Sequence, residues 1–187
     1  MSNVISDNQR RLNEALHAKR DDYGNRPDGS GMAGNLTIAL KRMNELGICN
    51  SLLDYGTGKG SLVKKLRGEL PNTINVMGYD PAVEKWKAKP DKPVDILISL
   101  DVLEHIEMQS IDAVLKDIAS LTKNFCYLVI DLQPAVKRLP DGRNAHILLA
   151  PSEWWVTRIS QIFPCISAFP IMHAKGVPQK LVIAGTQ

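Results

Sequence analysis

The chain has 187 residues, 44% of them hydrophobic, which is enough for one domain with a buried core. A net charge of +3 does not by itself indicate nucleic acid, and an aromatic content of 5% offers no evident platform for base stacking. No apolar run approaches the ~20 residues of a membrane span, no secretory signal begins the chain, and three scattered cysteines form neither a disulfide framework nor a zinc pattern, so we expect a cytoplasmic protein.

The N-terminal part is expected to contain two helices separated by a loop. The first covers residues 6–20, with Ser6 or Asp7 as its cap, and the second runs from Asn35 to Leu46 and ends at Gly47. Residues 21–34 between them are polar and rich in glycine, which predicts a loop.

From residue 50 onward, strand and helix patterns alternate, which predicts a doubly wound, mostly parallel α/β sheet. Strands are expected at 50–55, 74–80, 94–100 and 125–131, and helices at 60–69, 110–122 and 151–163. Ser110 is the expected cap of the helix 110–122. Short strands at 166–169 and 181–184 flank a Lys-Gly-Val-Pro turn near the end. The connection 81–93 has room for a helical turn at 83–87 but not for a further helix and full strand.

The strongest motif is Ser51-Leu-Leu-Asp-Tyr-Gly-Thr-Gly-Lys-Gly-Ser-Leu62, a short apolar strand that passes through alternating glycines into a helix. Glycines at such a turn let the backbone approach a ligand closely. The motif is not a phosphate-binding P-loop, because Gly60 rather than Ser or Thr follows Lys59. It is not the dinucleotide fingerprint either, because Ser61 stands where the last glycine belongs.

Two later strand ends complete the pattern. Val76-Met-Gly-Tyr-Asp80 ends in an acid, and the third apolar run continues into Asp101-Val-Leu-Glu-His-Ile106. Together with the glycine motif these segments resemble the class I S-adenosylmethionine-dependent methyltransferases. The resemblance implies a single domain over residues 1–187, a Rossmann-like three-layer α/β/α fold with a C-terminal antiparallel hairpin, and S-adenosylmethionine as cofactor with S-adenosylhomocysteine as product. We expect no metal.

The resemblance also implies roles for residues at the strand ends, where ligands of open α/β sheets bind. Glycines of the motif approach the methionine part of the cofactor, Asp80 binds the ribose hydroxyls, and Asp54 orders the loop or holds the cofactor ammonium through water. The expected cofactor-binding set is Asp54, Tyr55, Gly56, Gly58, Gly60, Asp80, Pro81, Leu100 and Asp101. A loop cap at Asp54 and a turn former at Asp80 are the structural alternatives.

Catalysis is less well specified, since methyl transfer depends mainly on aligning two reactants. A general base helps with a hydroxyl or protonated amine, and the candidates are His105, His146 and Asp131. The alternatives are a helix-capping role for His105 and a loop-stapling hydrogen bond for His146. Trp154 and Trp155 either contact the acceptor or pack against the core.

The DNA amino-methyltransferase signature is absent after residue 100, and so is a Pro-Cys dipeptide at that place, so we expect a small-molecule acceptor methylated at oxygen or nitrogen. Nucleic acid is not the expected partner. Residues 1–49 are expected to form a lid, and residues 132–153 an active-site loop. A cofactor-cleaving enzyme and a non-catalytic cofactor-binding module remain the alternatives. The basic residues Lys85, Lys87, Lys89, Lys92, Lys137, Arg138 and Arg143 form either a rim for an anionic acceptor or a solvated surface.

Overall fold

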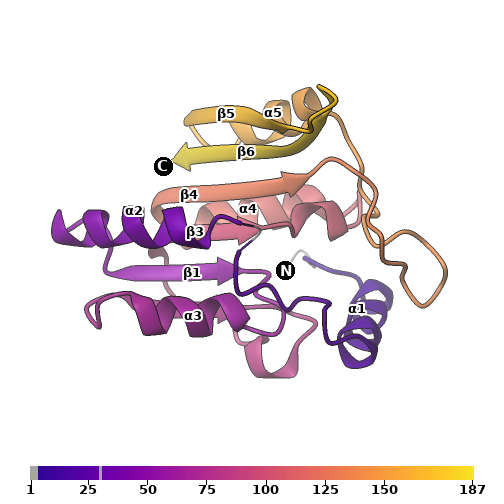
Figure 1. The fold of residues 1–187 in the computed structure, drawn as a ribbon, viewed down its shortest axis with the longest axis horizontal. Helices are drawn as coiled ribbons and strands as arrows, with labels where there is room; N and C mark the ends of the chain where they lie inside the picture. The colour runs from indigo at the N-terminus through magenta and orange to yellow at the C-terminus, as the bar shows by residue number, and fades with distance from the viewer. Residues whose placement is uncertain (1–3, 30) are drawn as a thin grey trace.

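The computed structural model describes residues 4–29 and 31–187, so residues 1–3 and 30 of the expected lid and loop lie outside the description. Its centre is a six-stranded sheet in the order β2-β1-β3-β4-β6-β5 (Figure 1). Strands β2 (Asn75–Tyr79), β1 (Ser51–Tyr55), β3 (Val94–Leu100) and β4 (Thr122–Asp131) are parallel, whereas β6 (Pro178–Thr186) and β5 (Cys165–Met172) add an antiparallel hairpin. This confirms the predicted fold class.

Helices cover both faces of the sheet because successive strand residues point to opposite sides. In β1, Leu52 packs with helices α2 (Ala33–Glu45) and α3 (Ser61–Glu69), while Leu53 packs with α4 (Ile111–Leu121) and α5 (Ser152–Ser160). The central strand β3 is buried along its whole length, as expected of a parallel strand between two helical layers.

The elements agree with the predicted ones, with two differences. The hairpin strands are longer than expected because β6 pairs with β4 from Phe125 to Asp131 and with β5 on its other side, which fixes residues that carry little periodicity of their own. Ser110 occupies the N-cap position of α4 as predicted, but its side chain makes no capping hydrogen bond; its αR backbone (φ −101°, ψ −14°) differs from the extended form of a capping residue. Ser6, in contrast, caps α1 (Asp7–Lys19) by accepting a hydrogen bond from the backbone N–H of Gln9.

The connection between β2 and β3 contains only the short 3₁₀ turn η1 (Glu84–Trp86), as its length predicted. The carbonyl of Trp86 accepts a hydrogen bond of 2.9 Å from the backbone N–H of Asp80, which folds the turn back over the end of β2. The sheet therefore ends at β2 in the described residues.

The carboxyl ends of the parallel strands are covered by two segments far apart in the sequence. Helix α1 with the loop after it, and the long loop between β4 and α5, lie beyond the arrowheads of β1, β3 and β4 (Figure 1). A small apolar cluster of Leu16, Tyr23, Leu139 and Ala145 joins the two segments. No helix in the described residues is both long and apolar enough to cross a membrane.

Candidate functional site

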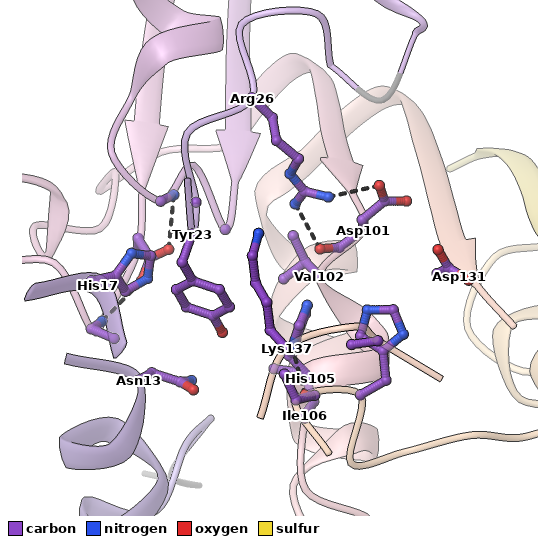
Figure 2. Close-up of a pocket in the computed structure, with 18 of the residues that line it drawn as sticks. Asn13, His17, Tyr23, Arg26, Asp101, Val102, His105, Ile106, Asp131 and Lys137 are labelled. Atoms are coloured by element: carbon purple, nitrogen blue, oxygen red, sulfur yellow. Dashed lines mark hydrogen bonds and ion pairs between the residues drawn. The ribbon is translucent and has the colours of Figure 1, made fainter. Parts of the chain in front are cut away.

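A cavity of about 440 Å³ lies between these covering segments and the strand ends (Figure 2). Most of the predicted site residues line it, namely Tyr55, Gly56, Gly58, Asp80, Pro81, Asp101, His105, Asp131 and His146. Asp54 and Leu100 instead line a second, much smaller hollow behind the glycine loop, and Gly60 faces the ring of Trp86. The carboxyl ends of the four parallel strands thus meet at one site, as the parallel topology requires.

The glycine loop is held in place by close contacts within the protein. Gly58 has a left-handed backbone (φ +56°), and a Cβ built on it would lie 2.6 Å from the carbonyl oxygen of Gly24. That position therefore accepts only glycine without moving the loop after α1. The same loop is fixed by a hydrogen bond of 2.8 Å from the Lys59 backbone N–H to the Gly24 carbonyl. At Gly58, the group that approaches the glycine backbone closely is therefore the backbone of Gly24.

Asp80 connects the end of β2 to the glycine loop. Its Oδ2 accepts a hydrogen bond of 2.9 Å from the Gly58 backbone N–H, and its Oδ1 accepts one of 2.9 Å from the Ala82 N–H. Burial raises the pKa of this carboxyl, although the two N–H donors and nearby His17 act in the opposite direction. Each oxygen keeps a further lone pair in a cavity-lining position, which suits a pair of neighbouring hydroxyl donors.

Asp54 is buried beneath the glycine loop rather than on the cavity wall. Its Oδ2 accepts a hydrogen bond of 2.7 Å from the Thr57 hydroxyl, which ties the strand end to the first part of the loop. Burial raises the pKa of Asp54 to about 6, against the lowering effect of the Thr57 bond. This geometry supports the loop-ordering reading of Asp54.

The end of β3 is held by two cations that the sequence analysis missed. Asp101 has a left-handed backbone (φ +51°), and its carboxylate lies 2.6 Å from Nη1 of Arg26 and 2.7 Å from Nζ of Lys180. Arg26 also donates to the carbonyls of Leu100 and Asp101, as Figure 2 shows in part. Lys180 stands directly before the apolar run of the last predicted strand and Arg26 sits in a polar loop, so nothing in the sequence distinguishes either of them.

Glu104 and His105 follow in the 3₁₀ turn η2 (Leu103–His105). The Glu104 side chain is fully buried; its Oε1 accepts a hydrogen bond of 3.2 Å from the Asp131 backbone N–H, and its Oε2 has no partner among the described residues. Burial, with Asp101 nearby, raises the pKa of Glu104 to about 8. A buried carboxyl is thus placed directly behind the cavity wall. The sequence leaves a solvated or a loop-ordering role open for Glu104, and its burial excludes the solvated one.

The two histidines of the wall both bond to the backbone. Nδ1 of His105 lies 2.7 Å from the Ala145 carbonyl, and burial lowers the pKa of this ring to about 3, with His146 adding to the effect. His146 likewise donates from Nδ1 to the Gln133 carbonyl, while its Nε2 lies 3.9 Å from Oε1 of Glu104. His105 therefore does not cap a helix, and His146 makes the loop-stapling bond while also lining the cavity.

The N-terminal wall contributes side chains that the sequence did not single out. His17 packs against Tyr23, with their ring centroids 4.6 Å apart, and Tyr23 lies edge-on to His105. Lys137 approaches from the opposite loop, forms an ion pair of 3.2 Å with Asp22 and lies over the Tyr23 ring. Figure 2 shows Tyr23, Lys137 and His105 gathered on one side of the cavity.

Other predicted features lie elsewhere. Trp155 is fully buried in the core, and Trp154 packs against that core with Arg158 over its ring, so neither lines the cavity. Of the seven basic residues considered as a rim, Lys137 alone is among the cavity-lining residues described. Lys87 and Lys89 form surface ion pairs instead, which agrees with the solvated-surface alternative.

A methyltransferase-domain family model matches residues 5–169, so the chain belongs to a methyltransferase-domain family. Its fold and family together define it as an S-adenosylmethionine-dependent methyltransferase of the Rossmann-like class. Among curated protein sequences, none matches this chain significantly.

Solved structures resemble the chain over most of its length. The DhpI–SAH complex is 17% identical, with a TM-score of 0.58, over 96% of this chain and 97% of that one. A 1,6-didemethyltoxoflavin-N1-methyltransferase from Burkholderia thailandensis, with bound 1,6-didemethyltoxoflavin and S-adenosylhomocysteine, is 13% identical (TM-score 0.59; 92% of this chain, 88% of that one). A SAM-dependent methyltransferase from Archaeoglobus fulgidus is 16% identical (TM-score 0.54; 83% and 94%). At these identities the likeness shows the fold.

Proposed function

We propose that the protein transfers the methyl group of S-adenosylmethionine to an oxygen or nitrogen of a small-molecule acceptor in the 440 Å³ cavity. One observation carries this proposal. The buried carboxylate of Asp80 presents two backbone-fixed oxygens on one wall, while His105, His146 and Lys137 line the other. Such an arrangement provides a ribose-binding acid and a separate polar surface for a second reactant.

On the cofactor side, we propose that Asp80 binds both ribose hydroxyls and that the loop from Tyr55 to Gly58 contacts the methionine part. Pro81 and Asp101 belong to the same wall. Because the single charge of Asp101 is already shared between Arg26 and Lys180, it suits the positive end of the cofactor only as part of this three-residue network. Asp54, Leu100 and Gly60 support the wall from behind.

On the acceptor side, the three catalytic candidates have different capacities. The pKa of His105 is about 3, far below neutral pH, so this ring is a poor general base. His146 and Asp131 are then the base candidates for a hydroxyl or protonated amine. Lys137 supports an anionic acceptor, although its ion pair with Asp22 offsets part of its charge.

Calorimetric titration with S-adenosylmethionine and S-adenosylhomocysteine tests the cofactor site. We expect binding by the wild type and a loss of affinity of at least tenfold in Asp80→Ala, because two charge-assisted hydrogen bonds disappear and the Gly58 and Ala82 N–H groups lose their acceptor. Asp91→Ala, an exposed change in the β2–β3 connection, is the control and should bind as the wild type.

Absence of binding in the wild type, or equal binding in Asp80→Ala, contradicts the proposed site. Incubation with labelled cofactor and candidate acceptors then separates the activities. Label transfer that requires an acceptor supports the proposal, and cofactor breakdown without one indicates a cleaving enzyme.

A further inference from the structure

Three side chains with metal-ligating groups meet at the cavity wall, where His105 and His146 line the cavity and Glu104 lies behind them. Glu104 and His105 are neighbours in η2, and His146 comes from the loop after β4. One donor atom of each lies within 4.8 Å of those of the other two. Residues 105 and 146 are separated in the chain by helix α4, strand β4 and part of the following loop, so the fold alone brings the two histidines together.

Hydrogen bonds fix which nitrogen of each ring is available. A backbone carbonyl only accepts, so Nδ1 of His105 donates to Ala145 and Nδ1 of His146 donates to Gln133. In the neutral rings, Nε2 therefore carries the lone pair. A histidine that binds a metal generally donates its other N–H to a carbonyl or carboxylate in this way. Both histidines thus have the tautomer that a metal site needs.

The third group is a buried carboxyl with an oxygen that makes no hydrogen bond in the described part of the chain. Glu104 is 0% exposed, and its Oε2 has no hydrogen-bond partner in the described part of the chain. An unpartnered buried carboxylate is costly unless a cation or donor compensates it. The nearby cations are committed elsewhere, since Arg26 and Lys180 are both bound to Asp101.

The spacing is close to that of a bound ion. Metal–ligand bonds to nitrogen and oxygen are about 2.0–2.2 Å long, so two donor atoms of a tetrahedral site lie about 3.4 Å from each other. Nε2 of His146 and Oε1 of Glu104 are 3.9 Å apart, so a shift of under an ångström brings this pair to ligating distance. His105 and His146 both line the cavity, which leaves the remaining coordination positions accessible from it.

We propose that Glu104, His105 and His146 bind one divalent transition-metal ion of the Zn²⁺ or Fe²⁺ type, with an open position facing the cavity. Two imidazoles and one carboxylate suit these ions better than Mg²⁺ or Ca²⁺. The identity of the group in the open position rests on the proposed function: an acceptor hydroxyl fits it, because a metal lowers the pKa of a bound hydroxyl. The hydroxyl proton passes to a base, for which Asp131 is the candidate, and the oxygen bonds to the methyl carbon as the sulfur–methyl bond breaks and sulfur keeps the electron pair.

Titration of the chelator-treated, full-length protein with Zn²⁺ tests the site without any cofactor. We expect one ion per chain, a matching Co²⁺ absorption spectrum, and no comparable binding of Mg²⁺. His146→Ala and Glu104→Gln should each weaken Zn²⁺ binding at least tenfold. His173→Ala removes an exposed histidine outside the cavity-lining residues and should bind as the wild type.

Circular dichroism checks that the variants fold. If a variant does not fold, the Zn²⁺-induced rise in the Tm of the wild type still tests for the metal site. Stoichiometric binding that is unchanged in both folded variants, or no binding and no Tm shift in the wild type, overturns the inference. S-Adenosylmethionine titration of the same samples keeps the two proposals separate. A protein that binds cofactor but no Zn²⁺ disproves only the metal site, and one that binds Zn²⁺ but no cofactor disproves only the proposed function.

Discussion

At the scale of single residues, carboxyl groups at the strand ends differ because their surroundings differ. Asp80 accepts two backbone N–H groups, Asp101 is paired with two cations, and Asp54 accepts a hydrogen bond from the Thr57 hydroxyl. Asp54 and Asp80 bond to the glycine loop and to the turn after β2, whereas the partners of Asp101 come from the loop after α1 and from β6, where the sequence does not reveal them. Of the three acids, Asp101 is therefore the one whose side-chain ion pairs both come from residues far away in the chain.

Asp54 makes the stability of the free protein dependent on pH. Its folded-state pKa of about 6 lies above the ordinary aspartate value of 3.8, so the folded state holds the proton more tightly and stability falls as the pH rises from about 4 to 6. At 1.36 kcal/mol per pKa unit, the ionised form costs roughly 3 kcal/mol above pH 6. Asn keeps an oxygen for the Thr57 hydroxyl but cannot ionise.

We therefore expect Asp54→Asn to gain stability relative to the wild type as the pH rises from 4 to 7, by up to about 3 kcal/mol. The buried NH₂ group of the new asparagine lowers the stability of the variant by the same amount at every pH. The change of the stability difference with pH is therefore unaffected. Urea denaturation at pH 4, 5, 6 and 7.5 measures the difference, and a difference that stays constant across this range contradicts the assignment.

At the scale of elements, the glycine loop shows why spacing alone predicted a binding loop but not its contacts. The pattern indicates backbone that needs positive φ and close approach. The pattern does not indicate whether a ligand or another part of the chain approaches the glycines. In this fold the approaching groups include Gly24 at Gly58 and Trp86 at Gly60. The loop is thus braced by the protein as well as open to a ligand.

Two glycine-to-alanine changes compare a glycine whose backbone and contacts exclude a side chain, Gly58, with one that has open space around it, Gly68. Gly58→Ala should lower stability by at least about 1–2 kcal/mol, because alanine resists the left-handed backbone and its Cβ would meet the Gly24 carbonyl. It should also weaken cofactor binding, since the loop must move. Gly68→Ala, in α3 with open space around its Cβ, should raise stability by about 0.5–1 kcal/mol.

Urea unfolding and calorimetry on both variants check this prediction. Equal stability and equal cofactor affinity for the two alanine variants would show that the Gly58 contact does not matter.

At the scale of the whole molecule, the site is closed by the N-terminal segment, which we propose acts as a lid. Arg26 anchors it to the end of β3 through one carboxylate and two carbonyls. Tyr23, only 8% exposed, packs in the same segment against the loop after β4. Opening of residues 20–29 would expose both the cofactor wall and the acceptor wall.

Arg26→Ala should therefore increase chymotryptic cleavage after Tyr23 by about tenfold, since hydrogen bonds to charged groups are each worth about 1.5–3 kcal/mol before solvent screening. Arg11→Ala, an exposed change on α1, is the control. In the wild type, S-adenosylmethionine should slow the same cleavage. Cleavage that neither Arg26→Ala nor the cofactor alters would count against a lid.

The sequence by itself determined the alternation of strands and helices, the glycine motif, the acids at the strand ends and the resemblance to a methyltransferase family. These are local properties, since periodicity, turn chemistry and short motifs depend on neighbouring residues. Only the tertiary structure decided that Arg26 and Lys180 bind Asp101 and that His146 meets Glu104 and His105. Parallel strands place their carboxyl ends at one edge, and long loops fold back over that edge, so residues with no relation in the sequence become neighbours there.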